Sequence, residues 1–440
     1  MPIIRSPAAI DILSERRLRL DGDGHRIYQG DRCLPRALLA DRRYPTQRPS
    51  SAPAAHVKAE HCPVLGARRA TAWAVPVLAG VVVAVLTTLC GATSASALVS
   101  IAEGDNSTAI AYEGSSNSLI FLWQSYGSQA WQPELVAPSQ STLSSPAEAL
   151  GNGATNIAAE GPIHSLDFYS QDYGSSGWNP ELVQPDDAAF SAPAILEADN
   201  ANVVAVEGPE NSLDFYWQSY GSAVWSETTI GPPGSAYSAP CIGAYAGHVG
   251  VFVEGPDHTL YGRYTLYDHK QFNGPWATQQ AEGTGTTYSA PACGYDAFEG
   301  PGHDLNIVAA FEGRGNDLQV WAVSDLRAVT ETVAGPGTTF SAPAVALGNS
   351  SISIAALGSH KSLDFYWQAV APGQAPNASG WHQEQVAGTG STFSVPTMAE
   401  GNNSTTIAAE GPHHSLSFYW QPYGGTTWNY ETAASNGSLY

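Results

Sequence analysis

The chain has 440 residues, with 18 Lys and Arg against 40 Asp and Glu and a formal net charge of −22. This length accommodates one large domain or two to three ordinary ones, and the abundant Gly, Pro, Trp and Tyr indicate a turn-rich globular protein. The composition argues against a disordered chain, a coiled coil and a helical bundle. The acidic balance argues against a nucleic-acid partner, because phosphates require a basic surface.

The first 97 residues differ from the rest in charge, because they hold most of the Lys and Arg. Within them, two Arg residues precede an apolar run over residues 70–92, and a small-x-small ending follows up to Ala97. This order is typical of a secretory signal peptide, so we expect one at 64–97, with cleavage after Ala97. The alternative is an uncleaved membrane anchor through 70–92, because that run is nearly long enough to span a bilayer.

Residues 1–63 are rich in Arg, Pro and Ala and have no apolar periodicity. We expect this segment to be unstructured, or to be a mis-assigned extension upstream of a bacterial start at Val64. The mature protein would then be residues 98–440, secreted and free of the membrane.

Residues 98–440 repeat one unit, which contains a Glu-Gly element at Glu113, Glu160, Glu207, Glu254, Glu312 and Glu410, with Leu357 in the remaining copy. The steps between these positions are 47, 47, 47, 58, 45 and 53 residues. Each unit has four short β-type segments separated by turn residues. Seven such copies predict an all-β fold, a seven-bladed β-propeller of four-stranded antiparallel blades.

The third unit shows the expected layout of a blade. Its segments are 201–207, 212–218 and 224–230, and we take the first strand of the blade, 239–244, from the start of the next copy. Gly-Pro between the second and third segments predicts a tight hairpin turn. The mature chain would begin and end at the same point of the repeat. We therefore expect intact first and last blades and a ring closed by packing between them.

The third segment of a complete unit reads Ser-Leu-Asp-Phe-Tyr-Trp-Gln, and its alternation separates two faces. One face in the third unit carries Leu213, Phe215 and Trp217, which we expect to pack against a neighbouring blade. The other face is polar. Its side chains form either a hydrogen-bonded ladder or a set that binds sugar hydroxyls in the clefts between blades.

A Trp recurs ahead of the fourth segment in six of the seven units, and an acid or amide follows it. These residues are Trp131, Trp178, Trp225, Trp276, Trp381 and Trp428. These rings are either ligand contacts or wedges between blades. The third and sixth units are the most complete, so we expect the best ligand-binding sites there. Their candidate residues are Asp214, Tyr216, Gln218, Trp225, Asp364, Tyr366, Gln368 and Trp381. The Glu-Gly carboxylates are interpreted first as turn residues and second as cation ligands.

The fourth and fifth units diverge, and Arg263 with nearby Lys270 leaves a unique site in the fourth unit as an alternative. The sequence has no Gly-x-Ser-x-Gly, His-Glu-x-x-His or Cys-x-x-Cys motif, and nearly every carboxylate is repeated around the ring, so we assign no catalytic residue, metal or cofactor. Cys241 and Cys293 follow their prolines by one and two residues, so they should face opposite ways. We therefore expect two free thiols, with a disulfide as the alternative that export would permit.

The repeated order of Ser-Ala-Pro-Ala, Glu-Gly, Ser-Leu-x-Phe-x-Trp and Trp-x-x-Glu resembles the blade of the Photorhabdus-type bacterial lectins. The resemblance implies a seven-bladed propeller that binds sugars between blades. Those lectins carry Arg or Lys where this chain has Glu160 or Tyr216, so it implies a general carbohydrate site rather than a fucose site. We predict a non-catalytic, multivalent lectin that prefers neutral to anionic glycans. The alternatives are an extracellular glycosidase or polysaccharide lyase and a protein-binding scaffold.

Overall fold

The computed structural model describes residues 99–439, except for 105, 129, 199, 246–247, 267–271, 296–304, 325–326 and 371–374. All of these residues belong to the unit Ala92–Tyr440. The predicted extension at 1–63 and signal peptide at 64–97 lie outside the described residues.

The described residues form seven antiparallel sheets of four strands, each built from one continuous stretch of chain. Blade 1 is β1 (Val99–Gly104), β2 (Ser107–Gly114), β3 (Ser118–Ser125) and β4 (Gln132–Ala137). Blade 2 is β5 (Ala147–Gly151), β6 (Ala154–Glu160), β7 (Leu166–Asp172) and β8 (Asn179–Gln184). Blade 3 is β9 (Ala194–Ala198), β10 (Ala201–Glu207), β11 (Leu213–Ser219) and β12 (Ser226–Gly231). Blade 4 is β13 (Cys241–Tyr245), β14 (His248–Gly255), β15 (Thr259–Leu266) and β16 (Ala277–Gln280).

The remaining blades follow the same order. Blade 5 is β17 (Ala292–Tyr295), β18 (Leu305–Glu312), β19 (Leu318–Ser324) and β20 (Arg327–Ala334). Blade 6 is β21 (Ala344–Gly348), β22 (Ser351–Leu357), β23 (Leu363–Ala369) and β24 (His382–Ala387). Blade 7 is β25 (Thr397–Gly401), β26 (Ser404–Glu410), β27 (Leu416–Pro422) and β28 (Asn429–Ala434). The fold is therefore the predicted seven-bladed β-propeller.

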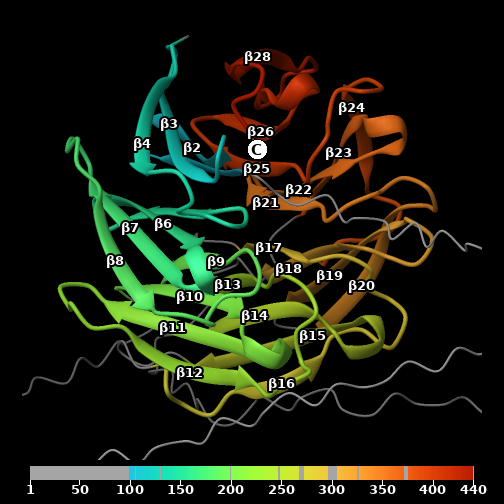
Figure 1. Cartoon of the computed structure of the whole chain (residues 1–440). Coiled ribbons are helices and arrows are strands. Elements are labelled where there is room, and N and C mark those ends of the chain that lie inside the picture. The colour runs from blue at the N-terminus through green and yellow to red at the C-terminus, as the bar shows by residue number, and fades with distance from the viewer. Residues whose placement is uncertain are drawn as a thin grey trace, which may run out of the picture. The chain divides into compact units, whose positions relative to one another are not determined.

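The first strand of each blade lies nearest the centre and the fourth lies at the periphery (Figure 1). Each first strand contacts the first strands of its two neighbours, and β1 contacts β25, so the ring is closed. Blades 1 and 7 are each complete, which confirms closure by packing between intact blades. The assignment of 239–244 to the third unit was wrong. The linker after each fourth strand leads into the next blade, so β13 pairs with β14 and begins blade 4.

The core consists of seven apolar clusters, each shared by two neighbouring blades. Leu213, Phe215 and Trp217 pack with Val249 and Val251 of blade 4, as predicted. The ring of Tyr216, on the other face of β11, packs with blade 2. Both faces of the middle strands are thus covered, because every blade is sandwiched between two others.

Five of the turns between second and third strands contain a single 3₁₀ turn, which confirms the predicted tight turn. They are η1 (Pro162–His164), η2 (Pro209–Asn211), η3 (Pro256–His258), η4 (Ser359–Lys361) and η5 (Pro412–His414). The last two residues of each have positive φ, as at Ile163 (57°) and His164 (59°). No helix among the described residues has the length and apolarity needed to cross a membrane.

Cys241 and Cys293 form a disulfide between blades 4 and 5, with a Cα–Cα distance of 5.3 Å. The expectation of two free thiols was wrong, although the expected directions hold. Cys241 packs in the cluster between blades 4 and 5, whereas its neighbour Ile242 faces blade 3. Cys241 lies on the face of blade 4 that packs against blade 5, and Cys293 lies on the face of blade 5 that packs against blade 4. The two side chains therefore point in opposite directions along the ring and approach each other.

Candidate functional site: the clefts between blades

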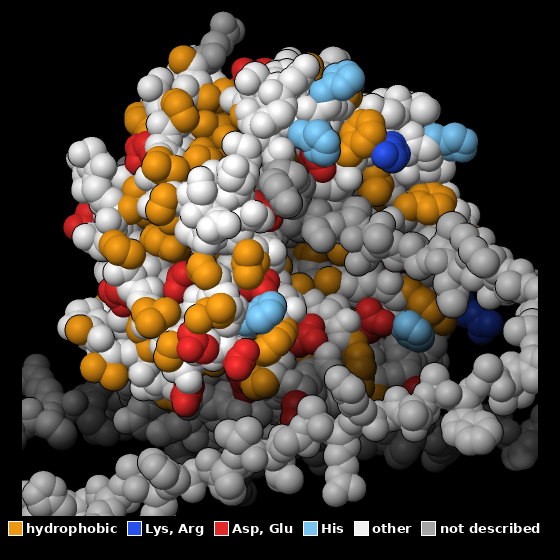
Figure 2. Space-filling view, in the orientation of Figure 1, with side chains coloured by type: hydrophobic (Ala, Val, Ile, Leu, Met, Phe, Trp, Pro, Cys, Tyr) orange, Lys and Arg blue, Asp and Glu red, His pale blue; other side chains and the backbone are white. Residues whose placement is uncertain are grey.

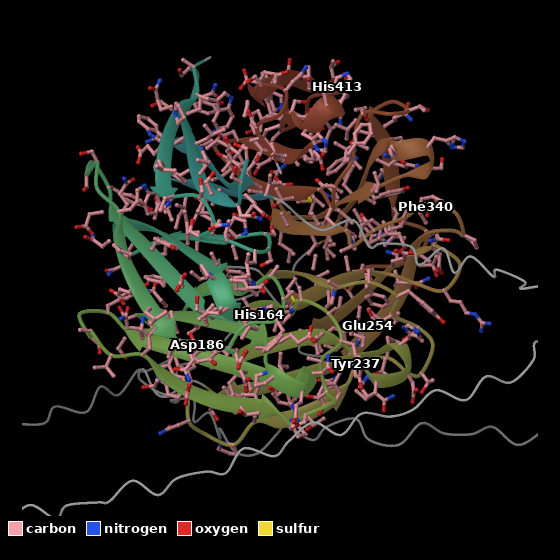
Figure 3. The ribbon with its side chains drawn as sticks, in the orientation of Figure 1. His164, Asp186, Tyr237, Glu254, Phe340 and His413 are labelled. Atoms are coloured by element: carbon pink, nitrogen blue, oxygen red, sulfur yellow. A yellow bond between two sulfur atoms is a disulfide. The ribbon has the colours of Figure 1, made fainter. Side chains whose placement is uncertain are left out.

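A cleft of about 320 Å³ lies between blades 2 and 3. Its lining residues are Gln184, Asp187, Ala188, Pro209, Asp214, Tyr216, Glu227, Thr228 and Thr229. Blade 2 contributes the end of β8 and the linker that follows, and blade 3 contributes η2, β11 and β12. Figure 3 labels Asp186, which precedes Asp187 in this linker. Two predicted site residues, Asp214 and Tyr216, therefore line one cleft.

Asp214 is held at the start of β11 with only 9% of its surface exposed. The Ser212 hydroxyl donates a hydrogen bond to its Oδ2 at 2.9 Å. A Cβ at position 208 would lie 1.8 Å from this oxygen, so Gly208 makes room for the carboxylate. The other oxygen, Oδ1, is buried and has no hydrogen-bond partner among the described residues. Asp214 thus offers a buried acceptor in a wall of the cleft.

Tyr216 and Glu227 are directly paired across β11 and β12. Tyr216 is 5% exposed. Burial raises the pKa of its hydroxyl, and the charges of Asp214 and Glu227 add to the rise. Glu227 and Glu181 each follow the recurring Trp of their blade in the sequence. The register instead pairs Phe215 with Thr228 and Phe168 with Glu181, so Thr228 is the counterpart of Glu181 and Glu227 faces the cleft.

Gln218 and Trp225 do not line this cleft. Both side chains instead donate hydrogen bonds to a glutamate of blade 2. Gln218 Nε2 donates to Glu181 Oε2 at 2.7 Å, and Trp225 Nε1 donates to the same oxygen at 3.0 Å. The indole also packs edge-on against Phe168, with 5.0 Å between ring centroids. We call this arrangement of one Glu with a Gln and a Trp of the next blade the clasp.

The clasp recurs at three other junctions of the ring. Its glutamates there are Glu134 with Gln171 and Trp178, Glu384 with Gln421 and Trp428, and Glu431 with Gln124 and Trp131. The recurring Trp residues of these junctions therefore serve as wedges between blades. One of them, Trp428, also lines a hollow of about 550 Å³ with Glu384, Gln385, Val386, Thr426 and Thr427, so a wedge can still face a ligand.

The four predicted site residues of blade 6 also make contacts within the structure, but their partners differ from those in blade 3. Asp364 accepts from the Ser362 hydroxyl at 3.1 Å, and burial raises its pKa. Tyr366 is 2% exposed, and Gln383 Nε2 donates to its hydroxyl at 3.2 Å. Burial and the neighbouring Asp364 raise the pKa of Tyr366 to about 12.

The other two candidates of blade 6 make different contacts, although Trp381 shares an apolar cluster with Tyr366. Gln368 exchanges hydrogen bonds with the backbone of Asn377, at 2.7 and 2.8 Å. Trp381 packs against the cluster of blades 5 and 6. Its Nε1 is buried without a hydrogen-bond partner among the described residues. Blade 6 thus has no clasp with blade 5.

The Glu-Gly carboxylates bind their own turns, in agreement with the first of their two interpretations. Each accepts from an Asn or contacts a His four residues later, as in Glu207 with Asn211 at 2.6 Å and Glu254 with His258 at 2.6 Å. Figure 3 places Glu254 and Tyr237 close together on the face where these turns lie. No group of three or more His, Cys, Asp or Glu in the described part of the chain is arranged to hold a metal ion.

Arg263 in blade 4 occupies the position of Tyr216 and lies over the ring of Tyr261, 5.0 Å from its centroid. Its Nη1 donates to the Thr278 hydroxyl. Lys270, the other basic residue considered there, lies outside the described residues. A unique site in blade 4 stays a hypothesis.

Sequence reasoning missed two residues of the cleft, Asp187 and Glu227. Asp187 was discoverable, because the linkers of most other units carry Gly at its place, as at Gly234 and Gly337. Glu227 stands two residues after its Trp, whereas Glu181 stands three after Trp178. Because side chains alternate along a strand, a shift of one residue moves the carboxylate to the other face.

No protein-family model matches the chain, and no curated protein matches it in sequence. Among solved structures, the chain is similar to the BP39L lectin from Burkholderia pseudomallei, with a TM-score of 0.64 and 16% identity over 79% of this chain and 100% of that one. A variant of AofleA from Arthrobotrys oligospora has a TM-score of 0.50 and 11% identity, over 78% of this chain and 88% of that one. The Aleuria aurantia lectin, described as a six-bladed β-propeller with a fucose recognition mode, has a TM-score of 0.47 and 11% identity, over 79% and 97%.

The likenesses to BP39L and to the AofleA variant establish the class of fold, a β-propeller. The narrower resemblance to Photorhabdus-type lectins stays a prediction.

Proposed function

We propose that the protein is a secreted carbohydrate-binding propeller that holds glycans in clefts between its blades without transforming them. The observation that carries this proposal is the cleft of blades 2 and 3. Asp214, whose Oδ1 has no hydrogen-bond partner among the described residues, lines this cleft together with Tyr216 and two Thr residues. A few placed polar groups beside an aromatic surface suit a sugar, which offers hydroxyl donors and an apolar C–H face. The likeness in fold to the BP39L lectin supports the same function.

Multivalent binding follows as part of the proposal. Related positions occur around the ring, and a second hollow lies between blades 6 and 7. Several weak sites on one rigid ring would add up to useful avidity on a surface that presents many copies of a glycan. The acidic chain would favour neutral over anionic glycans, because carboxylates repel uronic and sulfated sugars at low salt. Secretion rests on the segment 64–97 and is tested by N-terminal sequencing of the exported protein.

A glycan array probed with the full chain tests the binding function. We expect retention on a subset of neutral glycans, weakened by Asp214→Ala and by Tyr216→Phe, which removes only a hydroxyl. Asp172→Asn is the control, because Asp172 is an exposed carboxylate of blade 2 outside the cleft. The proposal fails if the folded protein binds no glycan, or if both cleft variants bind as the parent does.

One observation favours glycoside hydrolysis as a second candidate. Asp214 is buried and Glu227 is exposed, and both border Tyr216. Two carboxylates in unlike environments are what a general acid and its partner require. Incubation of the bound glycans with the protein, followed by measurement of new reducing ends, decides between the two. Release that stops in Glu227→Gln would establish the enzyme and overturn the purely binding role.

A further inference from the structure

We infer that the cleft of blades 2 and 3 selects saccharides that carry a protonated amino group; this rests on the proposed function. Three carboxylates, Asp187, Asp214 and Glu227, line the cleft, and no lining residue is Lys, Arg or His. On the face shown in Figure 2, Asp and Glu side chains gather over blades 2 and 3 around one His, and the Lys and Arg side chains lie elsewhere. A cationic group placed there would offset the mutual repulsion of the three carboxylates.

Glu227 distinguishes this cleft from the equivalent places on the other blades. The residues paired with the strand position of Tyr216 elsewhere are Pro133, Pro180, Thr278, Thr330, Gln383 and Tyr430. None of them is charged. The carboxylate is therefore a departure from the repeat and not a consequence of it.

Asp187 is a second departure, in the facing wall. Its backbone N–H donates to the carbonyl of Ile163, and φ is 55°. The residues that make the same linker bond in other blades are Gln140, Gly234, Gly285, Gly337, Gly390 and Gly437. Glycine adopts a left-handed conformation without steric cost, whereas Asp does so at some cost in stability. Blade 2 thus has a carboxylate at a left-handed position where five of the other six blades have glycine and blade 1 has Gln140.

The surroundings of Asp214, one of these three carboxylates, supply a second observation. It is nine-tenths buried, and its Oδ1 has no partner among the described residues. A buried carboxylate oxygen without a donor is costly, and a cation bound in the cleft that this side chain lines would offset that cost. The acidic groups of the described residues are not grouped to hold a metal ion. Separated carboxylates instead suit a ligand whose charge and hydroxyls are spread over a sugar ring, with charge-assisted bonds to the amine.

Calorimetry of the full chain with two matched tetrasaccharides tests this inference. One is the tetramer of glucosamine and the other is the tetramer of N-acetylglucosamine, both at pH 6 and low salt. We expect the amino form to bind at least about tenfold more tightly, because acetylation removes the charge. Glu227→Gln and Asp187→Asn should each reduce the affinity for the amino form about fivefold and leave the acetylated form unchanged.

Asp172→Asn is the matched control, because it removes one exposed carboxylate of blade 2 outside the cleft. We expect it to change neither affinity. An equal loss in Asp172→Asn and Glu227→Gln would mean attraction to the whole acidic surface and would overturn the inference. Equal affinity for the two tetramers would also overturn it while leaving the proposed function standing. If the folded protein bound no glycan on the array, both the proposed function and this inference would be overturned.

Discussion

The indole N–H of Trp225 on blade 3 donates a hydrogen bond of 3.0 Å to Oε2 of Glu181 on blade 2. The same oxygen accepts from Gln218 Nε2 at 2.7 Å. Two side chains that resemble ligand contacts in the sequence thus join neighbouring blades, and one carboxylate holds both.

Glu181→Ala should lower the free energy of unfolding by about 1–3 kcal/mol, because it leaves two donors at the junction without their acceptor. Urea denaturation of the full chain measures this. Asp172→Ala is the matched control, since Asp172 is an exposed carboxylate of blade 2 and has no part in the clasp; its effect should stay within about 0.5 kcal/mol. Equal effects of the two changes would show that the clasp contributes nothing to stability.

Trp225→Phe and Trp381→Phe should differ in stability although the substitution is the same. The first loses the hydrogen bond to Glu181 and should cost about 1 kcal/mol. The second removes a buried N–H that has no described partner, so the loss should be near zero or reversed. Thermal unfolding of both variants compares them, and a larger loss in Trp381→Phe would contradict the prediction. Trp225 and Trp381 stay predicted ligand contacts until their binding is measured.

Reduction of the Cys241–Cys293 disulfide should destabilise the ring by about 2–4 kcal/mol, because the bond closes a loop between residues 52 apart in the sequence. The disulfide links blades 4 and 5 at a junction without a clasp, since blade 5 has no recurring Trp. Unfolding with and without dithiothreitol measures the effect. In a Cys241→Ala/Cys293→Ala variant the reductant should change nothing further; a residual effect would point to another cause.

Stability should fall as the pH rises from about 5 to about 7.5. Burial, together with Asp317 and Glu254, raises the pKa of Glu312 to about 7, against the opposing bond from Asn316. The folded state therefore binds the Glu312 proton more tightly than the unfolded state does. This proton stabilises the fold fully at a pH below the ordinary pKa of Glu, and the stabilisation is lost as the pH rises through the raised pKa of the folded state. Glu312→Gln should flatten the melting temperature across this range. An unchanged slope would assign the dependence to other groups.

Both carboxylate oxygens of Glu148 are buried. Burial raises its pKa well above the usual range, and the Ala111 backbone offsets this only in part. The equivalent residues of β1, β9 and β13 are Ile101, Ile195 and Ile242. Glu148→Ile should therefore raise the melting temperature at pH 7.5, and by less at pH 5, where the carboxyl is already protonated. A loss of stability at pH 7.5 would mean that Glu148 has a partner that Ile cannot replace.

Ile163→Asn should stabilise the protein by about 1 kcal/mol. Ile163 is β-branched, has φ 57° and is 65% exposed, so it bears the cost of a left-handed conformation and gains little from burial. Val224→Asn is the control, because Val224 is 69% exposed and is not left-handed. If both changes have the same effect on the midpoint of denaturation, backbone strain at Ile163 is not the cause.

The repeated sequence was sufficient to predict the number of blades, the four strands of each and the packing of Leu213, Phe215 and Trp217. These features depend on local alternation and on a unit that recurs, and both can be read along the chain. Ring closure between intact blades followed for the same reason, because the repeat starts and stops in phase.

Only the tertiary structure decided which side chains meet across the junctions. Trp225 meets Glu181, and Cys241 meets Cys293, because the touching faces belong to different blades and have opposite directions along the ring. The register of β12 against β11 likewise moved Glu227 out of the clasp and into the cleft. A single repeat contains no record of these contacts, because each junction is made by two units whose relative placement arises only when the ring closes.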